Sequence, residues 1–187
     1  MTLFNLQTID VYSKFINNKM GYMKPEIIAV VGKSNSGKTT LLEKIIPELK
    51  SRGYRLGIVK HAHHGFEMDK KGKDSWRHKK AGADATLVIS PATIALVKDE
   101  EPESVQDIRK YLSDMDIIIT EGFKREMIPK IEIFRKAGKH REPLCMDDKN
   151  LAAFVTDSDY KPDVPKFFLN DIEKIADFIE EHFIKNL

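Results

Sequence analysis

A segment of eight residues, Gly32-Lys33-Ser34-Asn35-Ser36-Gly37-Lys38-Thr39, constrains the fold of this chain more than any other feature. The uninterrupted apolar run from Ile27 to Val31 precedes it, which is typical of a strand buried on both faces. After it, apolar side chains recur every three or four positions, as in an amphipathic helix, at Leu41, Leu42, Ile45, Ile46 and Leu49. A strand, a glycine-bounded loop and a helix in this order predict a phosphate-binding loop.

The spacing within this loop suits a polyphosphate. Gly32 and Gly37 allow a tight turn that brings backbone N–H groups against phosphate oxygens, and the positive end of the following helix dipole points at the same charge. Lys38 adds a point charge for the outer phosphates, and the Thr39 hydroxyl is placed to bind Mg²⁺. The sequence therefore predicts a nucleoside triphosphate site. The expected contacts are Gly32, Lys33, Ser34, Asn35, Ser36, Gly37, Lys38, Thr39 and Thr40.

The composition gives no reason to expect nucleic acid or a membrane as a partner. The 31 basic and 29 acidic side chains leave a formal charge of +2, so the chain has no strong overall field. No apolar run approaches the roughly 20 residues that span a bilayer. We therefore expect a cytoplasmic protein. Its single cysteine, Cys145, excludes an intramolecular disulfide.

Apolar runs alternate with helical patterns along the chain, which predicts a doubly wound α/β fold with a mostly parallel sheet of the P-loop NTPase type. Besides the first strand, the expected strands are Leu56 to Lys60, Ala85 to Ser90, Thr93 to Val97, Asp116 to Thr120, Lys130 to Phe134, Leu151 to Val155 and Lys166 to Leu169. The further expected helices are Asp74 to Ala81, Ser104 to Leu112 and Asp171 to Phe183. In this interpretation residues 25–187 form one nucleotide-binding domain, and residues 1–24 are an N-terminal extension without an assigned function.

Two local features qualify this prediction. The strands on either side of Pro91-Ala92 are close enough to form a β-hairpin, which we expect to make the sheet mixed at one edge. In the helix after the phosphate loop, we expect Pro47 to disturb the helix and Gly53 to lie just beyond its end.

The densest polar segment follows the strand that ends at Lys60, and three interpretations of it compete. Its histidines, His61, His63 and His64, suit zinc or nickel but need a further ligand from elsewhere. The segment is also explained as a solvated loop. We favour a third interpretation, in which three cations bind phosphate and Asp69 contributes to the Mg²⁺ shell. These cations are Lys60, Lys73 and Arg77.

A second signature lies at Asp116-Ile117-Ile118-Ile119-Thr120-Glu121-Gly122. An apolar strand that ends in an acid and a glycine is typical of a Walker B element, where the acid holds a Mg²⁺-bound water and the glycine allows close approach of the γ-phosphate. Glu121 and Gly122 are our candidates for these roles. Together with Thr39 and Asp69, Glu121 completes the predicted metal site, and the predicted catalytic residues are Lys38, Glu121 and Asp69.

These motifs, together with Gly72-Lys73-Asp74-Ser75 and Pro129-Lys130-Ile131-Glu132, resemble the molybdopterin-guanine dinucleotide biosynthesis adapter protein family. The resemblance covers Glu26 to the C-terminus. It implies a GTP-binding homodimer with weak hydrolysis that assists the molybdenum cofactor guanylyltransferase, with molybdopterin or its acceptor enzymes as further candidate partners. The family is similar in fold to the nitrogenase iron protein group, and Lys33 falls where that group places a second lysine that reaches a partner subunit's nucleotide.

Guanine preference follows from this resemblance alone, because the Asn-Lys-x-Asp element of many GTPases is absent from the sequence. Asp157, at the end of a late strand, is our candidate for accepting hydrogen bonds from the purine. Asp171 is an alternative that is equally well explained as a helix N-cap.

We expect slow turnover, because no arginine finger can be assigned beyond the candidates Arg77 and Arg125. Two other functions stay open. One is a nickel or cobalt metallochaperone GTPase that uses the cluster from His61 to His64, and the other is a small-molecule P-loop kinase.

Overall fold

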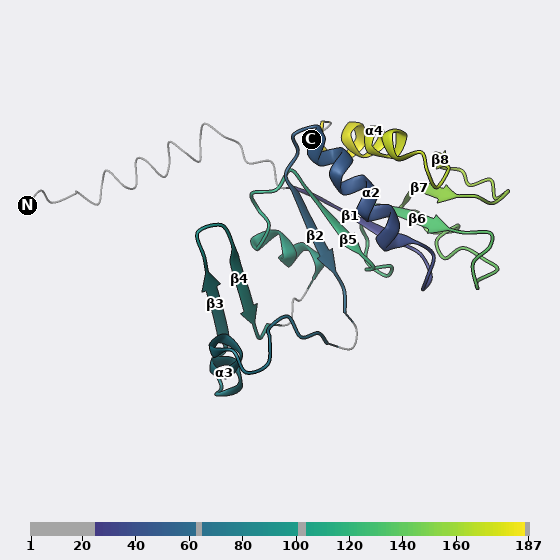
Figure 1. The fold of residues 1–187 in the computed structure, drawn as a ribbon. Helices are drawn as coiled ribbons and strands as arrows, with labels where there is room; N and C mark the ends of the chain where they lie inside the picture. The colour runs from purple at the N-terminus through teal and green to yellow at the C-terminus, as the bar shows by residue number, and fades with distance from the viewer. Residues whose placement is uncertain (1–24, 63–64, 101–103, 186–187) are drawn as a thin grey trace, which may run out of the picture.

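The computed structural model describes residues 25–62, 65–100 and 104–185, so the predicted extension of residues 1–24 lies outside the described residues. Six strands form one parallel sheet in the order β2-β5-β1-β6-β7-β8 (Figure 1). The strands are β1 (Glu26–Val31), β2 (Leu56–Lys60), β5 (Ile117–Glu121), β6 (Lys130–Phe134), β7 (Leu151–Thr156) and β8 (Lys166–Phe167). The predicted parallel α/β sheet is confirmed.

Both faces of the sheet are covered. The helices α2 (Lys38–Ser51) and α4 (Ile172–Phe183) lie side by side on one face, where Ile28 and Val30 of β1 pack into the larger core (Figure 1). On the other face, Ile27 and Ala29 pack with the short 3₁₀ helix η1 (Val105–Lys110) and with Cys145 from the β6–β7 connection of residues 135–150. β1 is therefore buried on both faces, which explains its continuous apolar run.

Helix α2 continues through Pro47 to Ser51, so the expected disturbance does not end it. Proline removes one backbone hydrogen bond, but buried Leu41, Ile45 and Leu49 hold the helix against the sheet. Gly53 follows the C-cap with φ +93°, as predicted for a residue just beyond the helix end.

The predicted hairpin forms, but its expected place in the main sheet is wrong. β3 (Ala85–Ile89) and β4 (Ile94–Lys98) make a separate two-stranded sheet, and α3 (Asp74–Lys80) adjoins it. Figure 1 shows this unit to one side of the parallel sheet. The edge of the main sheet beyond β5 is occupied by β2, whose parallel pairing with β5 follows from the β1–α2–β2 crossover.

The predicted helix from Ser104 to Leu112 is a shorter 3₁₀ helix. Ser104 and Asp107 form a capping box at its start. Val105 and Ile108, three residues apart, are both buried, and that spacing matches the three residues per turn of a 3₁₀ helix.

In the described part of the chain, no helix is long and apolar enough to cross a membrane.

Candidate nucleotide-binding site

The loop from Gly32 to Gly37 joins β1 to α2 and turns tightly. Asn35 has φ +62° and Gly37, the N-cap residue of α2, has φ +100°. No side chain caps the helix, so the first N–H groups of α2 are open to a ligand. This is the arrangement in which a helix N-terminus binds an anion.

Gly32 is required by a close contact as well as by its φ of +151°. A Cβ atom at this position would lie 2.5 Å from the carbonyl oxygen of Ile133 and 2.5 Å from Ser36 Oγ. The loop therefore rests directly on the end of β6. Ser36 Oγ is buried below it and has no hydrogen-bond partner among the described residues.

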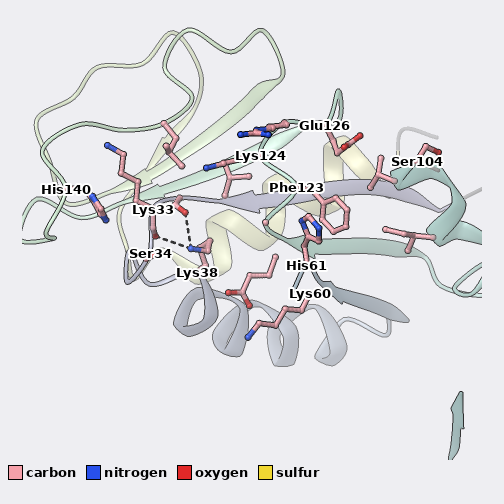
Figure 2. A pocket seen from close by; sticks show the side chains of 18 residues that line it. Lys33, Ser34, Lys38, Lys60, His61, Ser104, Phe123, Lys124, Glu126 and His140 are labelled. Atoms are coloured by element: carbon pink, nitrogen blue, oxygen red, sulfur yellow. Dashed lines mark hydrogen bonds between the residues drawn. The ribbon is translucent and has the colours of Figure 1, made fainter. Parts of the chain in front are cut away.

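Lys38 closes over the loop. Its ammonium donates hydrogen bonds to the carbonyl oxygens of Gly32, at 3.0 Å, and Lys33, at 3.1 Å (Figure 2). Partial burial lowers the pKa of Lys38, and the negative charge of Glu121 opposes this effect. The amine is thus held at the mouth of the loop, next to an acid.

The two predicted Mg²⁺ ligands from different elements meet. The Thr39 hydroxyl donates a hydrogen bond of 3.1 Å to Glu121 Oε1. Glu121 is the last residue of β5 and lies in register with Val30 of β1 and Lys60 of β2. The parallel pairing brings the ends of the three strands to the same edge, which is why residues far apart in sequence converge here.

A cavity of about 1180 Å³ opens in front of the loop. Gly32, Lys33, Ser34 and Lys38 line it from the loop, Lys60 and Glu121 line it from the ends of β2 and β5, and Gly122 lines it directly after β5. Figure 2 shows the side chains of Lys33, Ser34, Lys38 and Lys60. The opposite wall and rim are supplied by His61, Ser104, Val105, Ile108, Phe123, Lys124, Arg125, Glu126, His140 and Leu144. Cations outnumber acids on this lining, so the cavity suits an anionic ligand.

Four predicted site residues lie elsewhere in the described part of the chain, and none of them lines this cavity. Asp69 accepts the backbone N–H of Lys70. Lys73 is the N-cap residue of α3, and Arg77 within α3 lies 3.6 Å from Asp74. Asp157 accepts the backbone N–H of Lys136 at 2.6 Å. Their contacts with a nucleotide stay predictions.

The histidine cluster is only partly described, because positions 63 and 64 lie outside the described residues. His61 stacks on Phe123, with ring centroids 4.6 Å apart. Within the described residues, no three His, Cys, Asp or Glu side chains gather in a group that could hold a metal ion.

Sequence reasoning missed several basic side chains around the loop. A Cβ atom at Gly37 would lie 3.5 Å from Arg135 Nε, so this arginine reaches the loop from the end of β6. Lys124 and His140 line the cavity (Figure 2). Arg135 directly follows a strand that neighbours β1, and that position was a usable signal, whereas His140 is brought in by the β6–β7 connection.

The parallel sheet, the glycine-bounded loop after β1 and the acid that ends β5 define an α/β protein of the P-loop class. The family model described as molybdopterin guanine dinucleotide synthesis protein B matches residues 27–157. The chain therefore belongs to this family of biosynthesis adapter proteins, as its motifs indicated.

Known relatives agree with this assignment. The chain is 41% identical to the molybdopterin-guanine dinucleotide biosynthesis adapter protein of Escherichia coli K12 over 160 residues, 83% of this chain and 91% of the relative. It is 37% identical to the Haemophilus influenzae protein of the same name over 169 residues, 89% of this chain and 91% of the relative. The crystal structure of Bacillus subtilis MobB superposes with a TM-score of 0.67 at 28% identity, covering 84% of this chain and 98% of that one.

Proposed function

We propose that this protein is a GTP-binding adapter that assists the guanylyltransferase converting molybdopterin to molybdopterin guanine dinucleotide, with weak Mg²⁺-dependent hydrolysis of GTP. The relatives named above are adapter proteins of this biosynthesis. The role of the chain in the same pathway is inferred from membership of their family.

The meeting of Thr39 and Glu121 beside the glycine-bounded loop is the observation that carries the nucleotide part of the proposal. A hydroxyl and a carboxylate are the oxygen ligands that Mg²⁺ prefers, and phosphate oxygens and water complete its shell in P-loop proteins. When bound, Mg²⁺ neutralises charge on the phosphates. Ser36 Oγ, buried without a partner, and the open N–H groups of α2 also fit a phosphate ligand.

The same geometry favours slow hydrolysis. Glu121, whose charge acts on Lys38, is engaged with Thr39 and is placed to hold the metal shell, so it does not serve as the base for the attacking water. Arg125 lines the cavity, whereas Arg77 lies on the exposed helix α3. A partner that completes such a site is worth about 10³ to 10⁵ in rate for related P-loop enzymes.

A homodimer is part of the proposal, and the hairpin supports it. Leu87 and Ile89 of β3 lie opposite Leu96 and Ile94 of β4, so these four side chains share one face. Their exposed fractions are 45% to 69%. An isolated two-stranded hairpin is marginally stable, and an exposed apolar face of this kind marks an interaction site. A second copy of the chain presents the same face and covers both by two-fold symmetry.

The test is calorimetric titration of the full chain with GTP and ATP, with and without Mg²⁺. We expect GTP to bind more tightly than ATP, and Lys38→Ala to weaken GTP binding at least about 100-fold, while Lys174→Ala on the exposed side of α4 changes nothing. GTP turnover is then measured with and without the guanylyltransferase. Unaltered binding in Lys38→Ala, or fast unaided hydrolysis, would contradict the proposal.

A further inference from the structure

The cavity extends well past the phosphate loop. Its volume of about 1180 Å³ exceeds the upper end of the usual range for a single small ligand, roughly 1,000 Å³. The far wall is apolar, since Val105 and Ile108 of η1 are buried and Phe123 packs against them. This half of the cavity therefore differs in character from the cationic half around Lys38.

A triphosphate on the loop would leave the far half empty. Thr39 and Glu121 would hold Mg²⁺, which would neutralise charge on the terminal phosphates, so this pair marks the terminal-phosphate end of the ligand. The remaining phosphates then run along the loop away from β5 and toward β6. There, Asn35 and Ser36 lie beside Phe134 and Arg135, around a small hollow of about 10 Å³. The nucleoside is directed to that side of the sheet, away from Phe123.

An aromatic platform faces the far half of the cavity. Phe123 directly follows Gly122 and has φ +56°, a conformation that is uncommon for a bulky residue and that recurs at functional sites. Its ring stacks on His61 with an interplanar angle of 23° (Figure 2). Stacked aromatic side chains of this kind hold planar heterocycles.

Glu126 supplies a carboxylate on the same side of the cavity as Phe123 (Figure 2). Its backbone is fixed, because its N–H donates to the carbonyl oxygen of Phe123 at 3.1 Å and its own carbonyl accepts from Lys130 Nζ at 2.6 Å. No hydrogen bond from a described residue reaches its side-chain carboxylate. A carboxylate can accept two parallel N–H donors, and the edge of a 2-amino-4-oxo ring presents such a pair of N–H groups.

The neighbouring residues complete the recognition of an anion. Lys124 and Arg125 lie on the cavity rim directly before Glu126 in sequence, and both are exposed. Guanidinium and ammonium groups at this position suit a phosphate monoester. The cavity thus offers a stacking ring and a carboxylate in its far half, with two cations on the adjoining rim.

We propose that the far half of this cavity is a second ligand site, which binds a pterin carrying a phosphate monoester while the phosphate loop holds the nucleotide. Phe123 stacks on the ring, Glu126 accepts its amino and ring N–H groups, and Lys124 and Arg125 bind the phosphate. Guanine shares the 2-amino-4-oxo edge, so the experiment must separate the two rings. The choice of a pterin rests on the proposed function, whose relatives act in molybdopterin guanine dinucleotide biosynthesis.

The test is fluorescence titration of the full chain with 6-hydroxymethylpterin monophosphate, in the absence and presence of saturating GTP and Mg²⁺. Unphosphorylated 6-hydroxymethylpterin, GMP and inorganic phosphate are the separate control ligands. We expect the pterin phosphate to bind, with its fluorescence quenched by stacking, and its affinity to change less than about threefold when GTP is present. Mutual exclusion with GTP would overturn the proposal, because the far half would then hold the nucleotide's own base.

Three variants sharpen the result. Phe123→Leu keeps apolar bulk and removes the ring, and we expect pterin phosphate to bind about 5- to 100-fold more weakly. Glu126→Gln replaces one acceptor oxygen by a donor and should cost about 10-fold. Glu43→Gln, the same charge change on the exposed face of α2, should have no effect. GTP affinity should be unaltered in all three.

Lys38→Ala separates failure of this proposal from failure of the proposed function. We expect this variant to lose GTP while keeping pterin phosphate within about threefold, because the two ligands have different sites. If wild type binds GTP but no pterin phosphate, or if Phe123→Leu and Glu126→Gln bind it as wild type does, the second site is refuted and the nucleotide site stands. If wild type binds no GTP, the proposed function fails by itself.

Discussion

Glu132 on β6 offers the sharpest test of how the second face of the sheet is held together. Its side chain is only 1% exposed and accepts the backbone N–H groups of Leu144, at 2.5 Å, and Cys145, at 2.8 Å. These bonds fasten the 135–150 connection that brings His140 and Leu144 to the cavity. Glu132→Ala removes both acceptors at once.

The size of the effect follows from the burial of the two donors. An orphaned buried N–H costs about 1–3 kcal/mol. Cys145 is buried and should lie near the upper value, whereas Leu144 is 36% exposed and water can replace part of its bond. Removing a buried charge returns some free energy, so we expect a net loss of about 2–4 kcal/mol. For a chain of this size that lowers Tm by roughly 5–15 °C.

The loss should also depend on pH. Burial raises the pKa of Glu132, and the N–H bonds from Leu144 and Cys145 and the charge of Lys33 only partly oppose it. Between the unfolded pKa, near 4.5, and the raised folded pKa, the folded state binds more protons than the unfolded state. Wild-type stability therefore falls as pH rises through this window. The alanine variant lacks this dependence, so its deficit is larger at pH 4 than at pH 7.

Urea unfolding of both proteins from pH 4 to pH 7 measures this difference, since the other titrating groups are common to both and cancel. Glu142→Ala, which removes an exposed acid from the same connection, is the matched control and should change stability by less than about 0.5 kcal/mol. A deficit that grows toward pH 7 would refute the reasoning, because it would mean that the N–H groups stabilise the carboxylate by more than burial penalises it.

Three further predictions follow from the geometry. Gly32→Ala places a Cβ atom 2.5 Å from a backbone oxygen, so it should destabilise the fold by roughly 2–4 kcal/mol in thermal unfolding and abolish GTP binding. Gly72→Ala, also at positive φ but with open space around it, is the control and should cost only about 1 kcal/mol. Thr39→Ala should make GTP affinity insensitive to chelation of Mg²⁺, while Thr39→Ser keeps the dependence; equal dependence in both would exclude Thr39 from the metal shell. Ile94→Lys charges the exposed hairpin face and should give a monomer by light scattering, whereas a dimer of unaltered affinity would place the interface elsewhere.

The sequence predicted the structure correctly where the pattern of an element depends only on its own residues. The apolar run of β1, the glycines of the following loop and the periodicity of α2 predict a strand, a turn and a helix without reference to the rest of the chain, and all three are present. The acid and glycine at the end of β5 likewise predicted that Glu121 would approach Thr39, because carboxyl ends of neighbouring parallel strands share an edge.

Sequence was less informative where packing between distant segments decides the outcome. The pattern of Ala85 to Val97 predicts a hairpin but cannot say which sheet it joins, since strand pairing depends on which edges are already occupied. The residues of η1 suit a helix but form a 3₁₀ helix, with Val105 and Ile108 buried in the core.

What the sequence by itself determined is the P-loop class of the protein and the residues of its phosphate loop, since glycine conformation and strand and helix periodicity are properties of neighbouring residues. Only the tertiary structure decided what else surrounds the loop. His140 reaches the cavity because Glu132 holds the 135–150 connection, Phe123 and Glu126 reach it from the loop between β5 and β6, and η1 closes the far wall. These contacts join residues far apart along the chain, and the free energy that they contribute depends on burial, which a local sequence pattern does not determine.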